Sequence, residues 1–159
     1  MEKELSRRSF LKMGTTAAAA MAVSPSLLMG KEKKDKKAAP QPLDRKLKIL
    51  AVGIGGRGAS VLRGLETEDI IGLCDVDWKY AAHIFERYPN AKRYNDYRVM
   101  FKEMLDEADA VVVATADHTH AIIAAEAIAA GKHVYVEKPL THTVYESRLL
   151  TKLAAKHKV

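Results

Sequence analysis

The sequence predicts an α/β fold, a doubly wound parallel sheet with helices on both faces, over residues 46–159. Short apolar runs alternate there with segments of helical periodicity, which is the order expected of a parallel sheet. The run Val111-Val112-Val113 is continuously apolar, as expected for a strand covered on both faces. A glycine turn follows the first apolar run and opens a helix, the start of a doubly wound βαβ unit.

The predicted elements follow one another with short connections. Apolar runs predict strands at 47–52, 70–74, 92–94, 110–114 and 133–136. Apolar residues at helical spacing predict helices at 57–66, 78–88, 96–106, 118–130 and 143–157. We interpret Tyr97, Phe101, Met104 and Leu105 of the predicted helix 96–106, and the alanine-rich stretch 121–130, as core and not as a site. About 114 residues are enough for one domain with a modest core.

The glycine turn has the spacing G-x-G-x-x-G at Gly53, Gly55 and Gly58. In such a site Gly53 allows a tight turn, Gly55 lets a pyrophosphate approach bare backbone, and Gly58 lets helix and strand pack closely. Gly56 and Arg57 complete the turn, and the helix that follows offers its N-terminal N–H groups to an anion. Arg57 fits a phosphate contact and a solvated side chain equally well. The sequence therefore predicts a dinucleotide site.

An acidic residue stands where such a site needs one. The second apolar run ends in Asp75, 22 residues after Gly53. A carboxylate at this strand end can accept both hydroxyls of the adenosine ribose and would repel a 2′-phosphate, so it favours NAD over NADP. An ordinary strand-end carboxylate is the alternative. Asp77 is the rival position, but it is better placed to cap the next helix.

The first 45 residues form a different kind of segment. Arg7 and Arg8 precede Phe-Leu-Lys and a mild apolar run at 17–23, which is too short to span a membrane. This pattern predicts a twin-arginine signal peptide over 1–30, with the alternative of a disordered basic tail. A charged linker follows over 31–45. The signal predicts a periplasmic protein, with the twin-arginine translocase as a partner.

Charge is concentrated in the same N-terminal segment. Residues 1–45 contain ten Lys and Arg against five Asp and Glu, whereas the remainder contains sixteen against fifteen. The folded part therefore has no strong basic character, and we expect no nucleic-acid partner. Cys74 is the only cysteine, so an internal disulfide is impossible, and we interpret it as a small core residue.

Polar side chains follow the last two predicted strands. Thr115 and His120 lie after the fourth strand, and Glu137 and Lys138 after the fifth. Because the carboxyl ends of parallel strands meet at one edge, both segments are expected near the nicotinamide half of a dinucleotide. Lys138 could position a substrate hydroxyl and relay its proton, as could a histidine. The alternative for Lys138 is a surface lysine paired with Glu137.

Other kinds of site are less well supported. His118 and His120 could present two ligands to zinc beside Asp117, but nothing at suitable spacing supplies the rest, so we expect no metal. His118 is equally compatible with a substrate contact and with an exposed helix start. The chain has no G-x-S-x-G elbow and no G-x-x-x-x-G-K phosphate loop.

These motifs, taken in order, resemble the N-terminal half of the Gfo/Idh/MocA oxidoreductases, enzymes like glucose–fructose oxidoreductase and inositol dehydrogenase. The resemblance covers about residues 46–159. It implies that Lys138, in Glu-Lys-Pro with Glu137, contacts substrate and nicotinamide ribose, and that Thr115 and His120 line the cofactor. The chain departs from the family's Thr-Pro-Asn-x-x-His with Ala116 and Asp117.

The resemblance implies an exported NAD-dependent oxidoreductase acting on a sugar or polyol hydroxyl. It also implies a second α/β domain that closes the substrate pocket and builds a homo-oligomer. That domain is missing from these 159 residues, so we expect the chain alone to be inactive. An NAD-retaining glycoside-cleaving enzyme of the same superfamily and a nucleotide-binding module without turnover are the alternatives.

Overall fold

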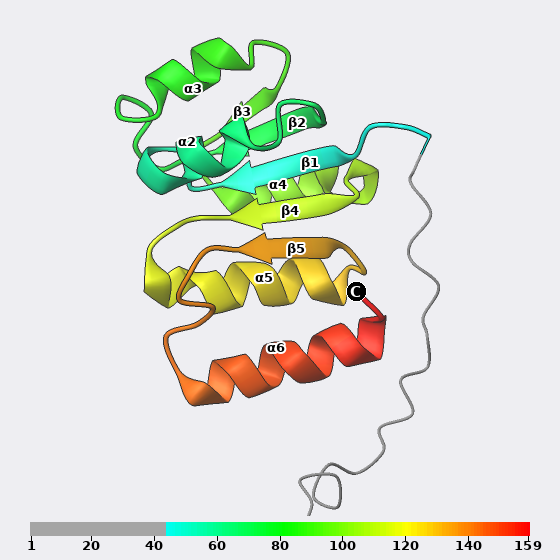
Figure 1. The fold of residues 1–159 in the computed structure, drawn as a ribbon. Coiled ribbons are helices and arrows are strands. Elements are labelled where there is room, and N and C mark those ends of the chain that lie inside the picture. The colour runs from blue at the N-terminus through cyan, green and yellow to red at the C-terminus, as the bar shows by residue number, and fades with distance from the viewer. Residues whose placement is uncertain (1–43) are drawn as a thin grey trace, which may run out of the picture. The chain divides into compact units, whose positions relative to one another are not determined.

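The computed structural model describes residues 44–159, and the predicted signal peptide therefore lies outside the described residues. Five parallel strands form one sheet in the order β3-β2-β1-β4-β5 (Figure 1). This order confirms the doubly wound sheet. The strands are β1 (Lys48–Val52), β2 (Asp69–Cys74), β3 (Lys92–Tyr94), β4 (Ala110–Val113) and β5 (His133–Val136).

Helices connect the strands at the predicted places, although several ends differ from the prediction. They are α2 (Gly56–Arg63), α3 (Ala82–Arg87), α4 (Tyr97–Met104), α5 (His120–Ala129) and α6 (Val144–His157), with short 3₁₀ turns η2 (Leu105–Glu107) and η3 (Asp117–Thr119).

The largest difference is the start of α3, which was predicted at residue 78. Asp77 caps a turn there, because its Oδ1 accepts a hydrogen bond from the Tyr80 N–H at 2.9 Å. The regular helix begins only at Ala82. Asp77 therefore caps this turn and not, as was predicted, the helix itself, because the N-cap of α3 is Ala81. The predicted helix start is wrong by four residues. Trp78 and Tyr80 therefore lie in a turn after β2.

Two apolar layers cover the two faces of the sheet. Alternate residues of β1 point to opposite sides, as the pleat requires. Ile49 and Ala51 pack in a cluster with residues of α2 and α3. Leu50 and Val52 pack in a second cluster with residues of α4 and α5. Tyr97 belongs to this second cluster, which confirms its interpretation as core.

Helix α6 packs on α5 (Figure 1). Its first turn carries a capping box, in which the Thr143 hydroxyl accepts from the Glu146 N–H and the Glu146 carboxylate accepts from the Thr143 N–H. Such a box satisfies N–H groups that have no partner inside the helix. None of the helices in the described part of the chain is long and apolar enough to cross a membrane.

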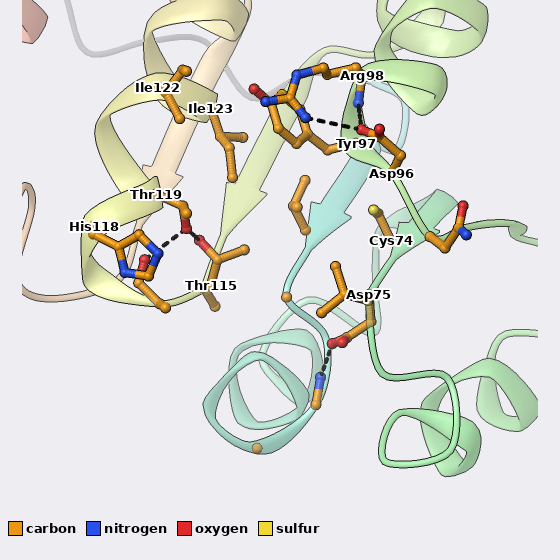
Figure 2. Close-up of a pocket in the computed structure, with 18 of the residues that line it drawn as sticks. Cys74, Asp75, Asp96, Tyr97, Arg98, Thr115, His118, Thr119, Ile122 and Ile123 are labelled. Carbon is orange, nitrogen blue, oxygen red and sulfur yellow. Dashed lines mark hydrogen bonds and ion pairs between the residues drawn. The ribbon is translucent and has the colours of Figure 1, made fainter.

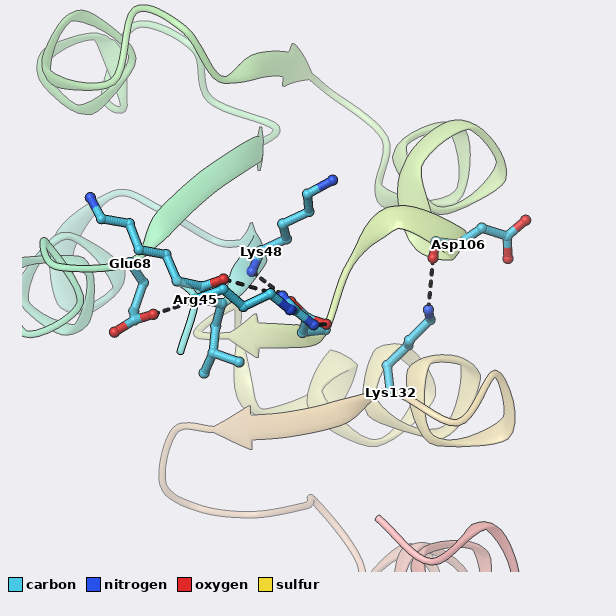
Figure 3. A network of polar contacts seen from close by, with 8 residues as sticks. Arg45, Lys48, Glu68, Asp106 and Lys132 are labelled. Carbon is cyan, nitrogen blue, oxygen red and sulfur yellow. Dashed lines mark hydrogen bonds and ion pairs between the residues drawn. The ribbon is translucent and has the colours of Figure 1, made fainter. Parts of the chain in front are cut away.

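Polar contacts link residues at the N-terminal ends of the strands, which is the edge of the sheet opposite the predicted site (Figure 3). The Arg45 guanidinium donates to both carboxylate oxygens of Asp109, at 2.6 and 2.7 Å, and the Lys48 N–H donates to the same carboxylate at 2.8 Å. The Arg45 hydrogen bond, with that of Lys48, holds the pKa of Asp109 far below its ordinary value. The folded domain thus includes Arg45, which we had assigned to the linker.

Candidate functional site

The glycine turn lies at the carboxyl edge of the sheet, between β1 and α2. Gly53 has a φ of +77°, which an L side chain rarely adopts, and its N–H donates to the Cys74 carbonyl at 2.8 Å. A Cβ on Gly58 would lie 1.9 Å from the Gly53 carbonyl oxygen. The two glycines therefore allow the start of α2 to pack directly against the end of β1.

Asp75 directly follows β2 and contacts the glycine turn. Its Oδ2 accepts from the Ile54 N–H at 2.9 Å and from the Gly55 N–H at 3.0 Å. Its Oδ1 accepts from the Asp77 N–H at 3.0 Å. A carboxylate has about four acceptor positions, so Oδ1 can still accept a hydroxyl. Asp75 thus fixes the turn and retains capacity for one further hydrogen bond at the same time.

A cavity of about 660 Å³ opens beside the turn (Figure 2). The glycine turn and the residues that follow β2, β3 and β4 line it. Of the predicted site residues it includes Gly53, Gly55, Gly56, Asp75 and Thr115. Apolar and aromatic side chains that were not predicted as site residues also line it, among them Tyr80, Tyr97 and Ile122.

Cys74 also lines this cavity and is buried. Burial, with the neighbouring charge of Asp75, raises the pKa of its thiol to about 12. A thiol with this pKa is protonated at neutral pH and is a poor nucleophile. The structure therefore confirms Cys74 as a core residue.

Arg57 and Glu137 join the start of α2 to the end of β5. The Arg57 Nε donates to Glu137 Oε1 at 2.9 Å, and the Tyr135 hydroxyl and the Lys138 N–H donate to the same carboxylate. Burial alone would raise the pKa of Glu137, but these donors outweigh it and hold the pKa below its ordinary value. Glu137 is thus an ionised, buried partner of an exposed arginine.

Lys138 is exposed beside this ion pair. Within residues 44–159 its ammonium group has no carboxylate within 4 Å, because the Glu137 carboxylate contacts Arg57 instead. The alternative of a Lys138–Glu137 surface pair therefore does not describe the structure. Lys138 remains available at the carboxyl edge of the sheet, although it does not line the cavity beside the glycine turn.

His120 supports the loops of the site from within. Its ring is 1% exposed, with Nδ1 2.7 Å from the Pro139 carbonyl oxygen and Nε2 3.0 Å from the Thr115 carbonyl oxygen. Both neighbours are backbone carbonyl oxygens, one from each loop, and the ring lies between them. His120 therefore ties the loop after β4 to the loop after β5, and it does not line the cavity.

Thr115 and His118 are on the cavity side of the same loop (Figure 2). The Thr119 hydroxyl donates to Thr115 Oγ1 at 2.7 Å, which fixes the first turn before α5. Among residues 44–159 no group of three His, Cys, Asp or Glu side chains is placed to hold a metal ion. The ring nitrogens of His120 face carbonyl oxygens, so they are not directed at His118 or Asp117.

Sequence reasoning missed the contribution of β3 to the site. Asn95, Asp96, Tyr97 and Arg98 directly follow β3 and line the cavity. The Arg98 guanidinium lies 4.8 Å over the Tyr97 ring and pairs with Asp96 (Figure 2). The rule that we applied to the ends of β4 and β5 applies equally to β3, and it could have found these residues. Tyr97 is both a core residue and a wall of the cavity.

The fold and the glycine-turn cavity define a doubly wound nucleotide-binding domain. Residues 47–159 match the GFO_IDH_MocA model, described as an oxidoreductase family with an NAD-binding Rossmann fold. The chain belongs to this family, and the domain is its NAD-binding domain. Residues 4–24 match the twin-arginine translocation signal, which indicates export.

Named relatives fall into two groups. A glycosyl hydrolase family 109 protein of Shewanella pealeana is 29% identical over 161 residues, covering 90% of this chain and 35% of the relative. Inositol 2-dehydrogenase of Salmonella typhimurium is 32% identical over 102 residues, covering 61% of this chain and 30% of the relative. The chain thus spans about a third of the length of these relatives.

Solved structures agree with the family. GenD2 from gentamicin A biosynthesis, in complex with NAD, is 31% identical with a TM-score of 0.64, covering 75% of this chain and 34% of that one. The WlbA dehydrogenase from Chromobacterium violaceum, in complex with NADH and UDP-GlcNAcA, is 27% identical with a TM-score of 0.62, covering 77% and 36%.

Proposed function

We propose that this domain serves an exported oxidoreductase that binds NAD in preference to NADP and acts on a hydroxyl of a sugar or polyol. The observation that carries the preference for NAD is the position of Asp75, which lies against the glycine turn with one carboxylate oxygen able to accept a further hydrogen bond. A 2′-phosphate at that place would meet a negative charge. The preference for a sugar or polyol is supported by the names of the relatives.

The residues of the cavity fit a dinucleotide. The glycine turn places residues without a side chain at the start of α2, where a helix N-terminus favours a phosphate. The cavity of about 660 Å³ extends from this turn to apolar side chains such as Ile122, and these suit a flat base. The buried His120 and the Arg57–Glu137 pair fix the surrounding loops. We therefore assign Thr115 to the cofactor wall and His120, Arg57 and Glu137 to its support.

NAD, when bound, accepts a hydride from a substrate carbinol carbon or returns it. In the proposed reaction Lys138 positions the substrate hydroxyl and takes its proton, which a lysine can do once its pKa is lowered in a closed site. The buried carboxylate of Glu137 fixes the backbone of Lys138 through the Lys138 N–H. Lys138 therefore extends from a rigid strand end.

A second candidate is glycoside cleavage with NAD retained through the cycle. It is favoured by the glycosyl hydrolase family 109 relative, which matches 90% of this chain, whereas the inositol 2-dehydrogenase matches 61%. Net production of NADH from a sugar or polyol separates the two candidates, because a retained cofactor is reduced and reoxidised within one cycle. The third candidate function is that of a domain that binds NAD without catalysing a reaction. We also propose a periplasmic location and a homo-oligomer for the whole protein.

The role of Lys138 is tested by Lys138→Ala in a form of the protein that turns over substrate. We expect kcat to fall by roughly 10²–10⁴-fold, the usual contribution of a positioned base, with melting temperature and NAD affinity nearly unchanged. Lys132→Ala is the matched control, since Lys132 stands at the opposite end of β5 and donates to the Asp106 carbonyl. Near-normal turnover of Lys138→Ala would contradict the role.

A further inference from the structure

Tyr80 covers the part of the glycine turn that the cofactor needs. A Cβ built on Gly55 would lie 2.4 Å from Cδ1 and 2.5 Å from Cε1 of the Tyr80 ring, and one on Gly56 would lie 3.0 Å from its hydroxyl. The space that these glycines leave by lacking a side chain is therefore filled by the Tyr80 ring. Sequence reasoning gave Tyr80 no role.

The backbone that carries this ring is fixed, whereas the ring itself is held only by packing. The Asp77 N–H donates to Asp75, and the Tyr80 N–H donates to Asp77, so the turn after β2 is anchored to the same carboxylate that caps the glycine turn. The side chain of Tyr80 is largely solvent-exposed, at 61%. Rotation of the ring away from Gly55 therefore breaks no hydrogen bond of the anchored turn.

The second glycine of a G-x-G-x-x-G turn is bare so that a pyrophosphate can approach the backbone there. The Tyr80 ring and the pyrophosphate of a dinucleotide consequently need the same volume over Gly55. We propose that Tyr80 is a determinant of cofactor affinity that occupies the pyrophosphate position in the ligand-free protein and rotates away when NAD binds. This inference rests on the proposed function, because it presupposes that the dinucleotide binds at this turn.

Competition of this kind has a definite thermodynamic signature. The apparent dissociation constant equals the intrinsic one divided by the fraction of molecules in which the ring is away from Gly55. Removal of the ring sets that fraction to one, so binding becomes tighter. Removal of the hydroxyl alone leaves the ring in place and changes nothing. Ligands without a pyrophosphate do not need the face of Gly55 and are insensitive to the ring.

The chain contains a natural fluorescent probe for ligand binding beside Tyr80. Trp78 is its only tryptophan and lies two residues before Tyr80. The indole N–H donates to the Tyr94 carbonyl at 3.4 Å, and the indole ring packs against Phe85 with centroids 5.5 Å apart. Because Trp78 is held to the body of the domain, its fluorescence reports on ligand arrival beside it in the wild type and in variants of Tyr80 alike.

The test compares the 159-residue wild type with Tyr80→Ala and Tyr80→Phe by stopped-flow fluorescence of Trp78, using NAD, ADP-ribose and adenosine. For the two pyrophosphate ligands we expect Tyr80→Ala to raise the association rate constant and the affinity at least about threefold. Tyr80→Phe should match the wild type, and all three proteins should bind adenosine equally. Melting temperatures establish that each variant is folded.

Equal NAD binding by Tyr80→Ala and the wild type would overturn the inference, and so would weaker binding, because the ring would then be a wall of the bound state only. A gain that extends to adenosine would also overturn it, since adenosine has no pyrophosphate. Failure of every folded protein to bind NAD would instead contradict the proposed function. The two failures are therefore distinguishable.

Discussion

Asp75→Asn separates two roles of this side chain: the observed hydrogen bonds to the glycine turn and the proposed hydrogen bond to the cofactor ribose. Asparagine keeps one carbonyl oxygen, which can still accept from the Ile54 and Gly55 N–H groups that now contact Oδ2. Its amide nitrogen replaces Oδ1, which accepts from the Asp77 N–H and has capacity for a ribose hydroxyl. The substitution therefore preserves the hydrogen bonds to the glycine turn and removes the proposed cofactor contact, together with the acceptor for the Asp77 N–H.

The magnitude follows from the loss of a hydrogen bond to a charged group, which contributes about 1.5–3 kcal/mol. Because each 1.4 kcal/mol is tenfold in affinity, NAD should bind roughly 10–150-fold more weakly to Asp75→Asn. NADP loses no favourable contact and is relieved of a repulsion. The ratio of the NAD and NADP affinities should therefore fall by at least about tenfold.

Isothermal titration of the folded chain with NAD and with NADP measures this ratio. Asp77→Asn is the matched control, since it removes the same charge from the same turn while its retained oxygen can still accept from the Tyr80 N–H. A wild type that binds the two cofactors equally, or an Asp75→Asn variant with unchanged NAD affinity, would refute the assignment of Asp75 to the ribose. Asp75 would then be only a cap of the glycine turn.

Three further outcomes follow from single contacts. Gly58→Ala should lower the free energy of unfolding in urea by about 3 kcal/mol, because its Cβ would lie 1.9 Å from a backbone oxygen; a loss below that of Gly64→Ala, whose nearest neighbour is at 3.3 Å, would contradict this. Asp109→Asn should cost about 1 kcal/mol at neutral pH. Since the pKa of Asp109 is lowered far below its ordinary value on folding, this difference should be constant above about pH 5 and shrink progressively as the pH falls from about 4 toward the lowered pKa; a difference that is as large at about pH 2 as at about pH 7 would rule out the ion pair as its source. Cys74, with its pKa raised to about 12, should react with a thiol reagent at pH 8 at least about a hundredfold more slowly in the folded chain than in urea, and equal rates would show that it is exposed.

Much of the architecture was predictable because local sequence patterns determine it. The apolar runs gave all five strands, and the glycine turn at Gly53 and Gly58 marked where the sheet edge carries its site. Asp75 was predictable for the same reason, since the spacing from Gly53 is fixed by one helix and one strand. The capping role of Asp77 also depends only on neighbouring residues.

Contacts between distant segments could not be predicted in this way. Arg57 and Glu137 are 80 residues apart, and nothing near Arg57 in the sequence identifies its partner. His120 was expected to line the cofactor, but its burial between the Thr115 and Pro139 carbonyls depends on how two loops pack. The Tyr80 ring likewise reaches the glycine turn only through the tertiary fold.

Calorimetric titration of the folded 159-residue chain with NAD tests the central claim most directly. The account predicts saturable binding at one site per chain, competition by ADP-ribose, and weaker binding of NADP. It also predicts that Gly55→Ala abolishes binding without unfolding the chain, because a methyl group would replace the flexible Tyr80 ring over the turn. A folded chain that binds neither dinucleotide, or that binds NAD equally well after Gly55→Ala, would contradict the assignment of the glycine turn as the cofactor site.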